Sequence, residues 1–491
     1  MAKQAIIAPA TTPNDAAAAA VRKVAPGFTS GRADGSKLAA IVADQIVGDI
    51  AKAGWSPGEI VGSEAELLER YGVSRAVFRE AVRLLEHLHV ARMRRGPGGG
   101  LMVMEPTVDS VTDAVSVYLY YVGAEIDEVF EARLTLEEVA AELAPQRLQE
   151  LDIAALRALL VREAAGEEHS HRELHNLVAS ISRNPALAFF VDLLNRATQL
   201  YLPSATKLGR DTLTASAGAH TAIADAILAG EGTLARRRMQ KHLKAEAEFL
   251  RARRPSRRRL ADLPDVVGRS DKRAEQLARK VLREIAAAGW PVGELLGSEA
   301  ELMERHDVSR AVLREAVRVL EHHQVAKMRR GPGGGLFVSE PGVEAVTEAV
   351  ALQIDRLGIL PAHLFEVRTA VEMAVLDHVV AHLDADGEAA LRAALADEEA
   401  ATDTELLVMG HDLHAVLAAV AGNRVMELLV LVLIRLTKFH GAAPPESEGV
   451  VPTGEVMHVH HRLVDAILDR DLDLARHRMR RHLDALARWT R

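Results

Sequence analysis

The sequence of 491 residues contains no cysteine, which excludes disulfide bonds and thiolate metal sites and favours a reducing cytoplasm. Its longest uninterrupted apolar segment, LLVLVLI at 428–434, is far too short to cross a membrane. The N-terminus also lacks the apolar segment of a secretory signal, so we expect a cytoplasmic protein with no membrane partner. Aromatic residues make up only 3% of the chain, and aliphatic residues must therefore fill its cores.

The chain has no excess of positive charge, but it does contain an internal repeat. Its formal net charge of −9 argues against general coating of nucleic acid and leaves room for a local basic patch. Residues 62–101 and 297–336 differ at eight of forty positions, and both end in RRGPGGGL. Weaker similarity links 225–243 to 465–483, which indicates a tandem duplication with about 235–240 residues per unit.

The closely matched part of each unit predicts a helix, a tight turn and a second helix. In the first unit, Ser63 and Glu66 form an S-x-x-E capping box, and Gly72 ends the helix that they begin. Ser74 is then placed to cap a second helix, RAVFREAVRLLEHLHV. This arrangement is typical of a helix-turn-helix, whose second helix enters the major groove of DNA.

Basic residues follow the pattern that such a helix needs. Arg75, Arg79 and Arg83 recur every four residues and form a stripe, for which a solvated helix face is the alternative interpretation. The following VARMRRGPGGGLMV predicts two strands joined by a glycine-rich tip, where backbone NH groups with Arg94 and Arg95 can approach phosphates. A nucleotide-binding loop is less well supported, because no Gly-Lys-Ser/Thr follows.

The E-x-E-L helix, the G-V-S-R-x-x-x-R-E-A segment and the basic glycine-containing hairpin together resemble the winged-helix domain of the GntR transcription regulators, twice in this chain. With the arginines of the hairpin tip, the DNA-contacting residues that this resemblance implies are Ser74, Arg75, Arg79, Arg95 and Gly96 in the first unit and Ser309, Arg310, Arg314, Arg330 and Gly331 in the second. Ala65 and Ala300 stand where many members have a DNA-contacting arginine. Asp307 replaces Gly72, so we expect a strained or remodelled turn there.

The remainder of each unit has helical apolar spacing without strand alternation, which predicts an all-α bundle. His171 and His175 share one helical face, and His220 and His242 each belong to another helix. Four imidazoles from three helices can hold one divalent cation such as zinc, nickel or cobalt. Surface or core histidines are the alternative interpretation.

These bundles resemble the FCD effector domain of the FadR branch of GntR proteins, many of which bind a metal through an Asp and three His. The resemblance implies the ligands His171, His175, His220 and His242 in the first unit and His414, His460 and His482 in a weaker second site, where Gly410 leaves one position unfilled. It also implies that Arg133, Arg196, Arg368 and Arg435 pair with a carboxylate effector, for which surface ion pairs are the alternative.

The fold class expected is therefore mostly α, with two winged helix-turn-helix domains alternating with two helical bundles. The predicted segments are a disordered tail at 1–33, winged helices at 34–104 and 271–339, effector-binding bundles at 105–250 and 340–491, and a basic linker at 251–270.

The function expected is a DNA-binding transcriptional regulator that acts as a covalent pseudo-dimer on a palindromic operator. Repression relieved by a small carboxylate or acyl thioester is the mode that the resemblance implies. A metal-dependent hydrolase, a metal-sensing protein and a sensor without DNA binding are the alternatives. The partners expected are double-stranded DNA and the small effector, and a homodimer of the fused chain is compatible with the sequence.

Overall fold

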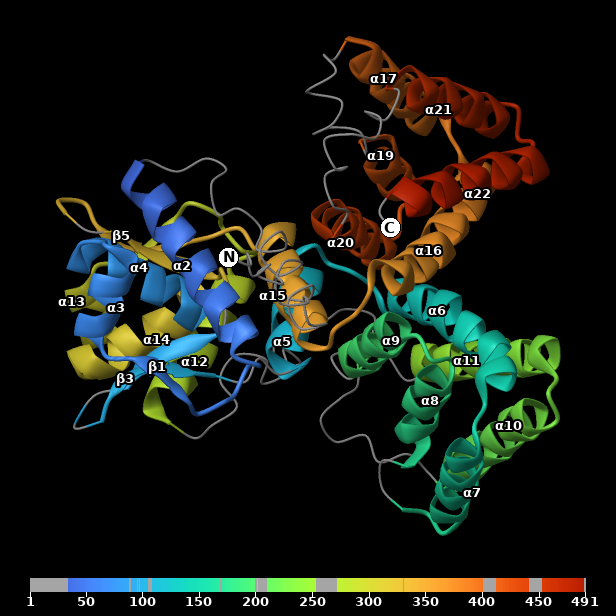
Figure 1. The fold of residues 1–491 in the computed structure, drawn as a ribbon, viewed down its shortest axis with the longest axis horizontal. Helices are drawn as coiled ribbons and strands as arrows, with labels where there is room; N and C mark the ends of the chain where they lie inside the picture. Colours follow the sequence, from blue (N-terminus) through green and yellow to red (C-terminus); the bar gives the residue numbers. More distant parts are fainter. Residues whose placement is uncertain are drawn as a thin grey trace, which may run out of the picture. The chain divides into compact units, whose positions relative to one another are not determined.

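The computed structural model describes residues 34–87, 90–94, 96, 98–104, 108–167, 170–198, 201, 210–252, 272–329, 331–400, 412–440 and 453–489. The chain is mostly helical, with two small antiparallel sheets, as predicted (Figure 1). The expected tail at 1–33 and all but the first two residues of the expected linker at 251–270 lie outside the described residues. No described helix is long and apolar enough to span a membrane.

Each unit begins with a reading head, which we define as a three-helix domain with a three-stranded sheet. The elements of the first reading head are α2 (Asp34–Lys52), β1 (Ile60–Gly62), α3 (Glu64–Tyr71), α4 (Arg75–His87), β2 (Ala91–Arg94) and β3 (Gly100–Val103). The elements of the second are α12 (Arg273–Ala287), β4 (Leu295–Gly297), α13 (Glu299–His306), α14 (Arg310–His322), β5 (Ala326–Arg329) and β6 (Gly335–Val338). The strand orders, β1-β3-β2 and β4-β6-β5, are the same.

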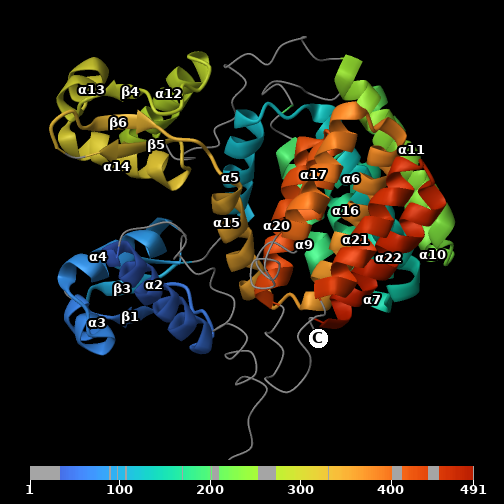
Figure 2. The same ribbon diagram turned by 90° about the horizontal axis from the view of Figure 1, so that it is seen from above.

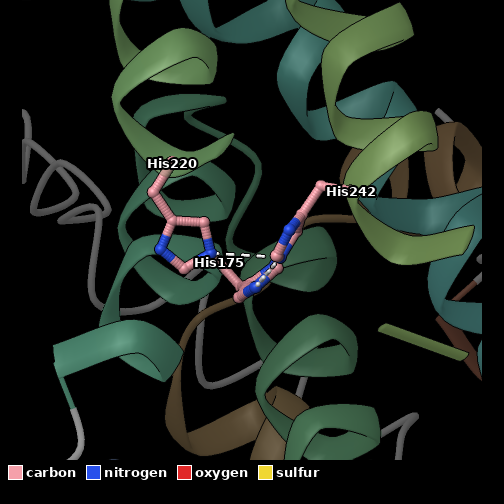
Figure 3. A group of neighbouring side chains, drawn as sticks. All are labelled: His175, His220 and His242. Carbon is pink, nitrogen blue, oxygen red and sulfur yellow. Dashed lines mark hydrogen bonds between the residues drawn. The ribbon is translucent and has the colours of Figure 1, made fainter. Parts of the chain in front are cut away.

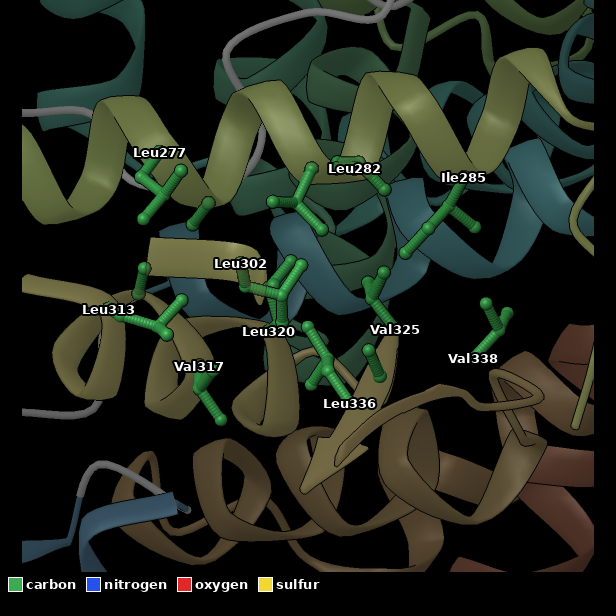
Figure 4. Close-up of a cluster of buried hydrophobic side chains, with 14 of the residues drawn as sticks. Leu277, Leu282, Ile285, Leu302, Leu313, Val317, Leu320, Val325, Leu336 and Val338 are labelled. Carbon is green, nitrogen blue, oxygen red and sulfur yellow. The ribbon is translucent and has the colours of Figure 1, made fainter. Parts of the chain in front are cut away.

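Aliphatic side chains build the core of each head, as the scarcity of aromatic residues requires. Figure 4 shows the second head, where Leu277, Leu282 and Ile285 of α12 face Leu313 and neighbouring side chains of α14 and the sheet. Burying these side chains stabilises the head by roughly 1.5–3 kcal/mol for each large aliphatic residue.

The last glycine of each GPGGG run is required by strand pairing. A Cβ on Gly100 would lie 2.4 Å from the carbonyl oxygen of Gly62, and one on Gly335 would lie 2.5 Å from that of Gly297. Only glycine therefore lets β1 approach β3, and β4 approach β6, this closely. The last glycine of each run is therefore needed for strand pairing, while the earlier glycines form the hairpin tip.

A helix from the sequence that follows one head completes the core of the other head. The helix α5 (Val108–Tyr121) contributes Val117 to the second head, where Tyr120 and Tyr121 pack near Trp290. The helix α15 (Val343–Arg356) contributes Leu352 to the core of the first head. Each head is therefore held partly by the repeat to which it does not belong.

Two helical bundles form the rest of the chain (Figure 2). The first bundle consists of α6 (Ile126–Arg147), α7 (Glu150–Ala164), α8 (Ser170–Ile181), α9 (Pro185–Thr198), α10 (Arg210–Leu228) and α11 (Gly232–Ala252). The second bundle consists of α16 (Pro361–His382), α17 (Ala385–Ala400), α19 (Asp412–Val420), α20 (Arg424–His440), α21 (Thr453–Leu468) and α22 (Leu472–Trp489). The two bundles pack on each other mainly through α6, α9 and α16.

Candidate DNA-contacting helices and buried histidine clusters

The second helix of each helix-turn-helix starts at a serine that was predicted from the sequence to contact DNA. Ser74 and Ser309 accept hydrogen bonds from the backbone NH groups of Val77 and Val312, each at 3.4 Å. These serines therefore cap α4 and α14, and their hydroxyl hydrogens remain able to donate to a phosphate. The predicted capping box of Ser63 and Glu66 is also present at the start of α3.

The candidate DNA-contacting arginines lie on the exposed faces of α4 and α14. The side chains of Arg79, Arg310 and Arg314 are 67%, 63% and 60% exposed, whereas Phe78 and Leu313 of the same helices are buried. Helical periodicity thus separates the core face from a basic face in both reading heads. Arg75 is exposed as well.

A glutamate of the preceding helix pairs with Arg79 in the first head and with Arg310 and Arg314 in the second. Arg79 donates from Nε to Glu64 at 3.3 Å in the first head. In the second head, Glu299 accepts from Arg310 at 2.9 and 3.0 Å and from Arg314 at 3.0 Å. Hydrogen bonds from Arg310, and then from Arg314, lower the pKa of Glu299 to about 2, so it is a carboxylate at neutral pH.

The hairpin tips have the backbone conformation that glycine favours. Gly96 and Gly331 have φ angles of 103° and 101°, and Arg94 donates to the carbonyl oxygen of Gly98 at 3.0 Å. The tip arginines Arg95 and Arg330 lie outside the described residues.

The turn of the second head keeps its shape without glycine. Asp307 adopts a left-handed conformation with φ of 49°, close to the 62° of Gly72, and its NH group caps α13 in the same way. The turn is therefore strained rather than remodelled, and aspartate is one of the residues that tolerates this conformation best.

Three predicted histidine ligands meet inside the first bundle (Figure 3). His175 of α8, His220 of α10 and His242 of α11 are all buried, and we call them the first histidine cluster. Nε2 of His242 lies 3.0 Å from Nε2 of His220 and 3.3 Å from Nε2 of His175. His171 also belongs to α8, but its side chain lies outside the described residues.

The second bundle contains an equally compact group, the second histidine cluster, formed by His414, His460 and His482. Nε2 of His482 lies 3.0 Å from Nε2 of His414 and 3.2 Å from Nε2 of His460. The expectation of a weaker second site rested on Gly410, which lies outside the described residues. The three described ligands are brought together in both bundles to the same degree.

Carboxylates behind the rings orient the histidines. Glu137 and Glu163 contact Nδ1 of His175 and His220, the latter at 2.6 Å. In the second bundle, Glu372 and Glu398 contact Nδ1 of His414 and His460. A carboxylate that accepts from Nδ1–H leaves the Nε2 lone pair free to face inward, as in many metal sites. These carboxylates were not predicted from the sequence, although the repeat places glutamates at both pairs of positions.

The electrostatics of the clusters suit neutral, metal-ligating imidazoles. Burial lowers the pKa of His220 and His414, and that of His482 falls well below its ordinary value for the same reason. Burial alone would raise the pKa of Glu137, but His175 and Arg133 outweigh it and lower that pKa to about 2. Inward-facing lone pairs about 3 Å apart repel each other unless a cation lies between them. The donor set therefore fits a divalent metal that prefers nitrogen, such as zinc, nickel or cobalt.

Two of the four predicted effector arginines adjoin the clusters. Arg133 and Arg368 are buried and donate to Glu137 at 2.8 Å and to Glu372 at 2.5 Å, the carboxylates that also contact His175 and His414. The structure places Arg196 and Arg435 at more exposed positions. There they form ion pairs with Asp192 at 2.8 Å and with Glu344 at 2.6 Å.

Comparisons with known proteins find each domain type twice. The model for bacterial regulatory proteins of the gntR family matches residues 38–100 and 273–338, and the FCD domain model matches residues 128–245 and 363–485.

Similar proteins are named as transcription regulators. The uncharacterized HTH-type transcriptional regulator YcbG of Bacillus subtilis is 28% identical over 211 residues, which are 43% of this chain and 86% of that protein. The HTH-type transcriptional repressor NanR of Salmonella schwarzengrund is 30% identical over 253 residues, which are 46% of this chain and 91% of that protein. A Streptococcus agalactiae GntR structure is 25% identical, with a TM-score of 0.36, and covers 44% of this chain and 99% of its own. Less than half of this chain thus matches nearly the whole of either relative, which agrees with a tandem duplication.

Proposed function

Because the chain belongs to the GntR family of bacterial regulatory proteins and contains two FCD domains, we propose that it is a transcription repressor that binds a palindromic operator with both of its reading heads. The observation that carries this proposal is the repetition of one exposed basic helix. The helices α4 and α14 have the sequences RAVFREAVRLLEH and RAVLREAVRVLEH, which differ at two positions. Two reading heads with nearly the same helix should prefer half-sites of nearly the same sequence.

The contact between the bundles supports a covalent pseudo-dimer. Ordinary two-fold dimers bury the same surface of each subunit, so that each contact occurs twice. In this chain, asparagines at matching positions of the two bundles contact matching glutamates of the opposite bundle. Once one head binds its half-site, the other is held nearby at high effective concentration.

The bundles are the proposed sensing part. The first and second histidine clusters would each hold a divalent metal, which supplies a positive charge able to attract an anionic ligand. Arg133 and Arg368 lie beside the clusters and suit a carboxylate or an acyl thioester that carries anionic groups. A ligand that binds one arrangement of the heads more tightly than another would shift the chain toward that arrangement. The affinity for DNA would change by up to the difference in ligand-binding free energy between the two arrangements.

A metal-dependent hydrolase is the competing proposal, and the site geometry gives it less support. A hydrolase needs a general base beside the metal-bound water. The carboxylates in direct contact with the first cluster, Glu137 and Glu163, are occupied by histidine Nδ1 atoms, and Glu246 is paired with Arg133. We therefore propose that the chain is not an enzyme.

Selection of bound fragments from random DNA, followed by mutation, tests the regulator proposal. Arg79→Ala and Arg314→Ala should each weaken binding to the selected sequence by about 1–3 kcal/mol and relax the preference at one base position. Arg162→Ala, in an exposed ion pair of the first bundle, is the matched control and should leave binding unchanged. Failure to retard any fragment at low salt would refute the proposal.

A further inference from the structure

The acidic residue Glu246 distinguishes the first histidine cluster from the second. Aligning His242 with His482 places Glu246 opposite Leu486, one helical turn after the histidine in each case. The other described groups around the clusters have counterparts in both bundles: an arginine, two carboxylates and a threonine. Among the described residues, the two sites therefore differ by one negative charge.

Glu246 lies between the arginine and the histidines of the first cluster. Its Oε2 atom is buried, 3.5 Å from Nη2 of Arg133 and 4.0 Å from Nε2 of His242. Burial would lower the pKa of Arg133, but the charges of Glu246 and Glu137 outweigh burial and raise it. This carboxylate thus occupies the position where an anion from solution would meet both a guanidinium and a metal held by the cluster.

The described residues of the second cluster include an equivalent guanidinium and no carboxylate at that position. Arg368 is buried and donates to Glu372 at 2.5 Å and to Thr437 at 2.8 Å. Leu486 is uncharged and cannot replace the carboxylate of Glu246. A metal-loaded second cluster would therefore lack the anionic partner that Glu246 provides in the first cluster.

A charge balance leads to the same conclusion. With neutral histidines and one divalent cation, the positive charges of the metal and Arg133 are matched by Glu137, Glu163 and Glu246. In the part of the second bundle that the structure describes, Glu372 and Glu398 leave one positive charge uncompensated beside Arg368. An uncompensated buried charge is costly, and binding an anion removes that cost.

We propose that Glu246 acts as a built-in anionic ligand that closes the first site, so that one fused chain binds a small carboxylate only at its second site, beside Arg368. This inference rests on the proposed binding of metal by both clusters. It makes the two halves of the pseudo-dimer unequal: the first bundle keeps a closed site, and the second bundle senses the effector.

The test uses the full chain loaded with Co²⁺, whose visible absorption reports its ligands, and acetate as the smallest carboxylate. We expect two Co²⁺ per chain and a spectral change on acetate addition that corresponds to about half of the bound metal. Glu246→Leu should make both sites respond, and Leu486→Glu should abolish the response. Glu248→Leu, at an exposed position on the same helix, is the matched control and should behave as the unmodified chain does.

The outcomes separate this inference from the function on which it rests. Two bound Co²⁺ that both respond to acetate in the unmodified chain, or that both ignore it, would overturn the inference alone. Absence of cobalt absorption would overturn the metal proposal and the inference together, while the DNA selection judges the regulator independently. If Glu246→Leu does not fold, as judged by circular dichroism, Leu486→Glu decides: an acetate response that persists contradicts the inference.

Discussion

Asn184 of the first bundle and Asn423 of the second make equivalent pairs of contacts, each with the opposite bundle. Asn184 donates to Glu366 at 2.6 Å and to the carbonyl oxygen of His363 at 3.0 Å. Asn423 donates to Glu131 at 2.7 Å and to the carbonyl oxygen of Glu128 at 3.2 Å. A single polypeptide therefore builds within itself the reciprocal contact that a two-fold dimer builds between subunits.

Replacing both asparagines should weaken the packing of the two bundles on each other. Asn184 and Asn423 are buried, and each donates to a carboxylate, so Asn184→Ala and Asn423→Ala should each cost about 1.5–3 kcal/mol of unfolding free energy. Chemical denaturation measures this cost. An operator fragment that contains both half-sites should bind the double variant less tightly than the unmodified chain. Equal stability of the double variant and the unmodified chain would show that the contact contributes nothing.

The same contact should weaken in acid. Burial tends to raise the pKa of Glu366, but hydrogen bonds from Arg147 and Asn184 outweigh it and lower the pKa below its ordinary 4.5. A lowered folded-state pKa means that the stabilisation is fully present above about pH 4.5 and is lost as the pH falls through the lowered value.

Glu366→Gln isolates this contribution. The difference in unfolding free energy between the unmodified chain and the variant should be constant between pH 6 and 7 and shrink below about pH 4.5. Denaturation curves at a series of pH values measure it. A difference that grows in acid would contradict the assignment.

Releasing the arginines from their glutamate should increase the affinity for DNA and reduce the preference for the operator sequence. Glu299→Gln removes a negative charge beside the proposed DNA-contacting helix and frees Arg310 and Arg314, so affinity for random duplexes should rise several-fold at low salt. Preference for the selected operator should fall, because the guanidinium groups are no longer held in place. Fluorescence anisotropy with operator and random duplexes measures both effects.

The equivalent change in the first reading head should have a smaller effect. Glu64 pairs with Arg79 at 3.3 Å, whereas Glu299 holds two arginines. Glu64→Gln should therefore raise random-duplex affinity less than Glu299→Gln does. Glu69→Gln, at an exposed position in the last turn of the same helix, is the control. Loss of affinity in Glu299→Gln would instead mean that the ion pairs are needed for binding.

Local rules in the sequence were enough to predict the reading heads. Capping residues, the arginine spacing and the glycine-rich tip all depend on neighbours within a few positions, and α3, α4 and the hairpin formed as predicted. The requirement for Gly100 was not predicted, because the carbonyl oxygen of Gly62 approaches it from another strand.

The all-α class of the bundles could be predicted from the sequence, but the contacts among their buried polar residues could not. Which histidines converge depends on how helices pack, and the resemblance supplied His175, His220 and His242 where periodicity could not. Glu163 reaches His220 from a helix 57 residues away, and Glu246 reaches Arg133 from the last helix of the bundle. Pairing the two repeats position by position would have indicated Glu163, which recurs as Glu398, and the exchange of Glu246 for leucine.

Metal removal should destabilise both bundles. A metal present at 100 times its dissociation constant stabilises the folded chain by about 2.7 kcal/mol per site. Thermal unfolding with Zn²⁺ and with a chelator should therefore differ by several degrees. His220→Ala and His460→Ala should each remove about half of this difference if both clusters bind metal. A chelator effect that survives in the double variant would place the metal elsewhere.

Adding one methyl group to Gly100 should disrupt the first reading head. The new Cβ would meet the carbonyl oxygen of Gly62 at 2.4 Å and a methyl group of Ile60 at 2.7 Å, so β1 must move away from β3. Forcing extra volume into a packed site typically costs about 1–3 kcal/mol. Gly218→Ala is the matched control, because it lies exposed in α10 with open space around it and should stabilise that helix by roughly 0.5–1 kcal/mol. Because each head has its own core, Gly100→Ala should weaken the first half-site footprint on DNA more than the second, and an unchanged two-part footprint would show that the strands can accommodate the methyl group.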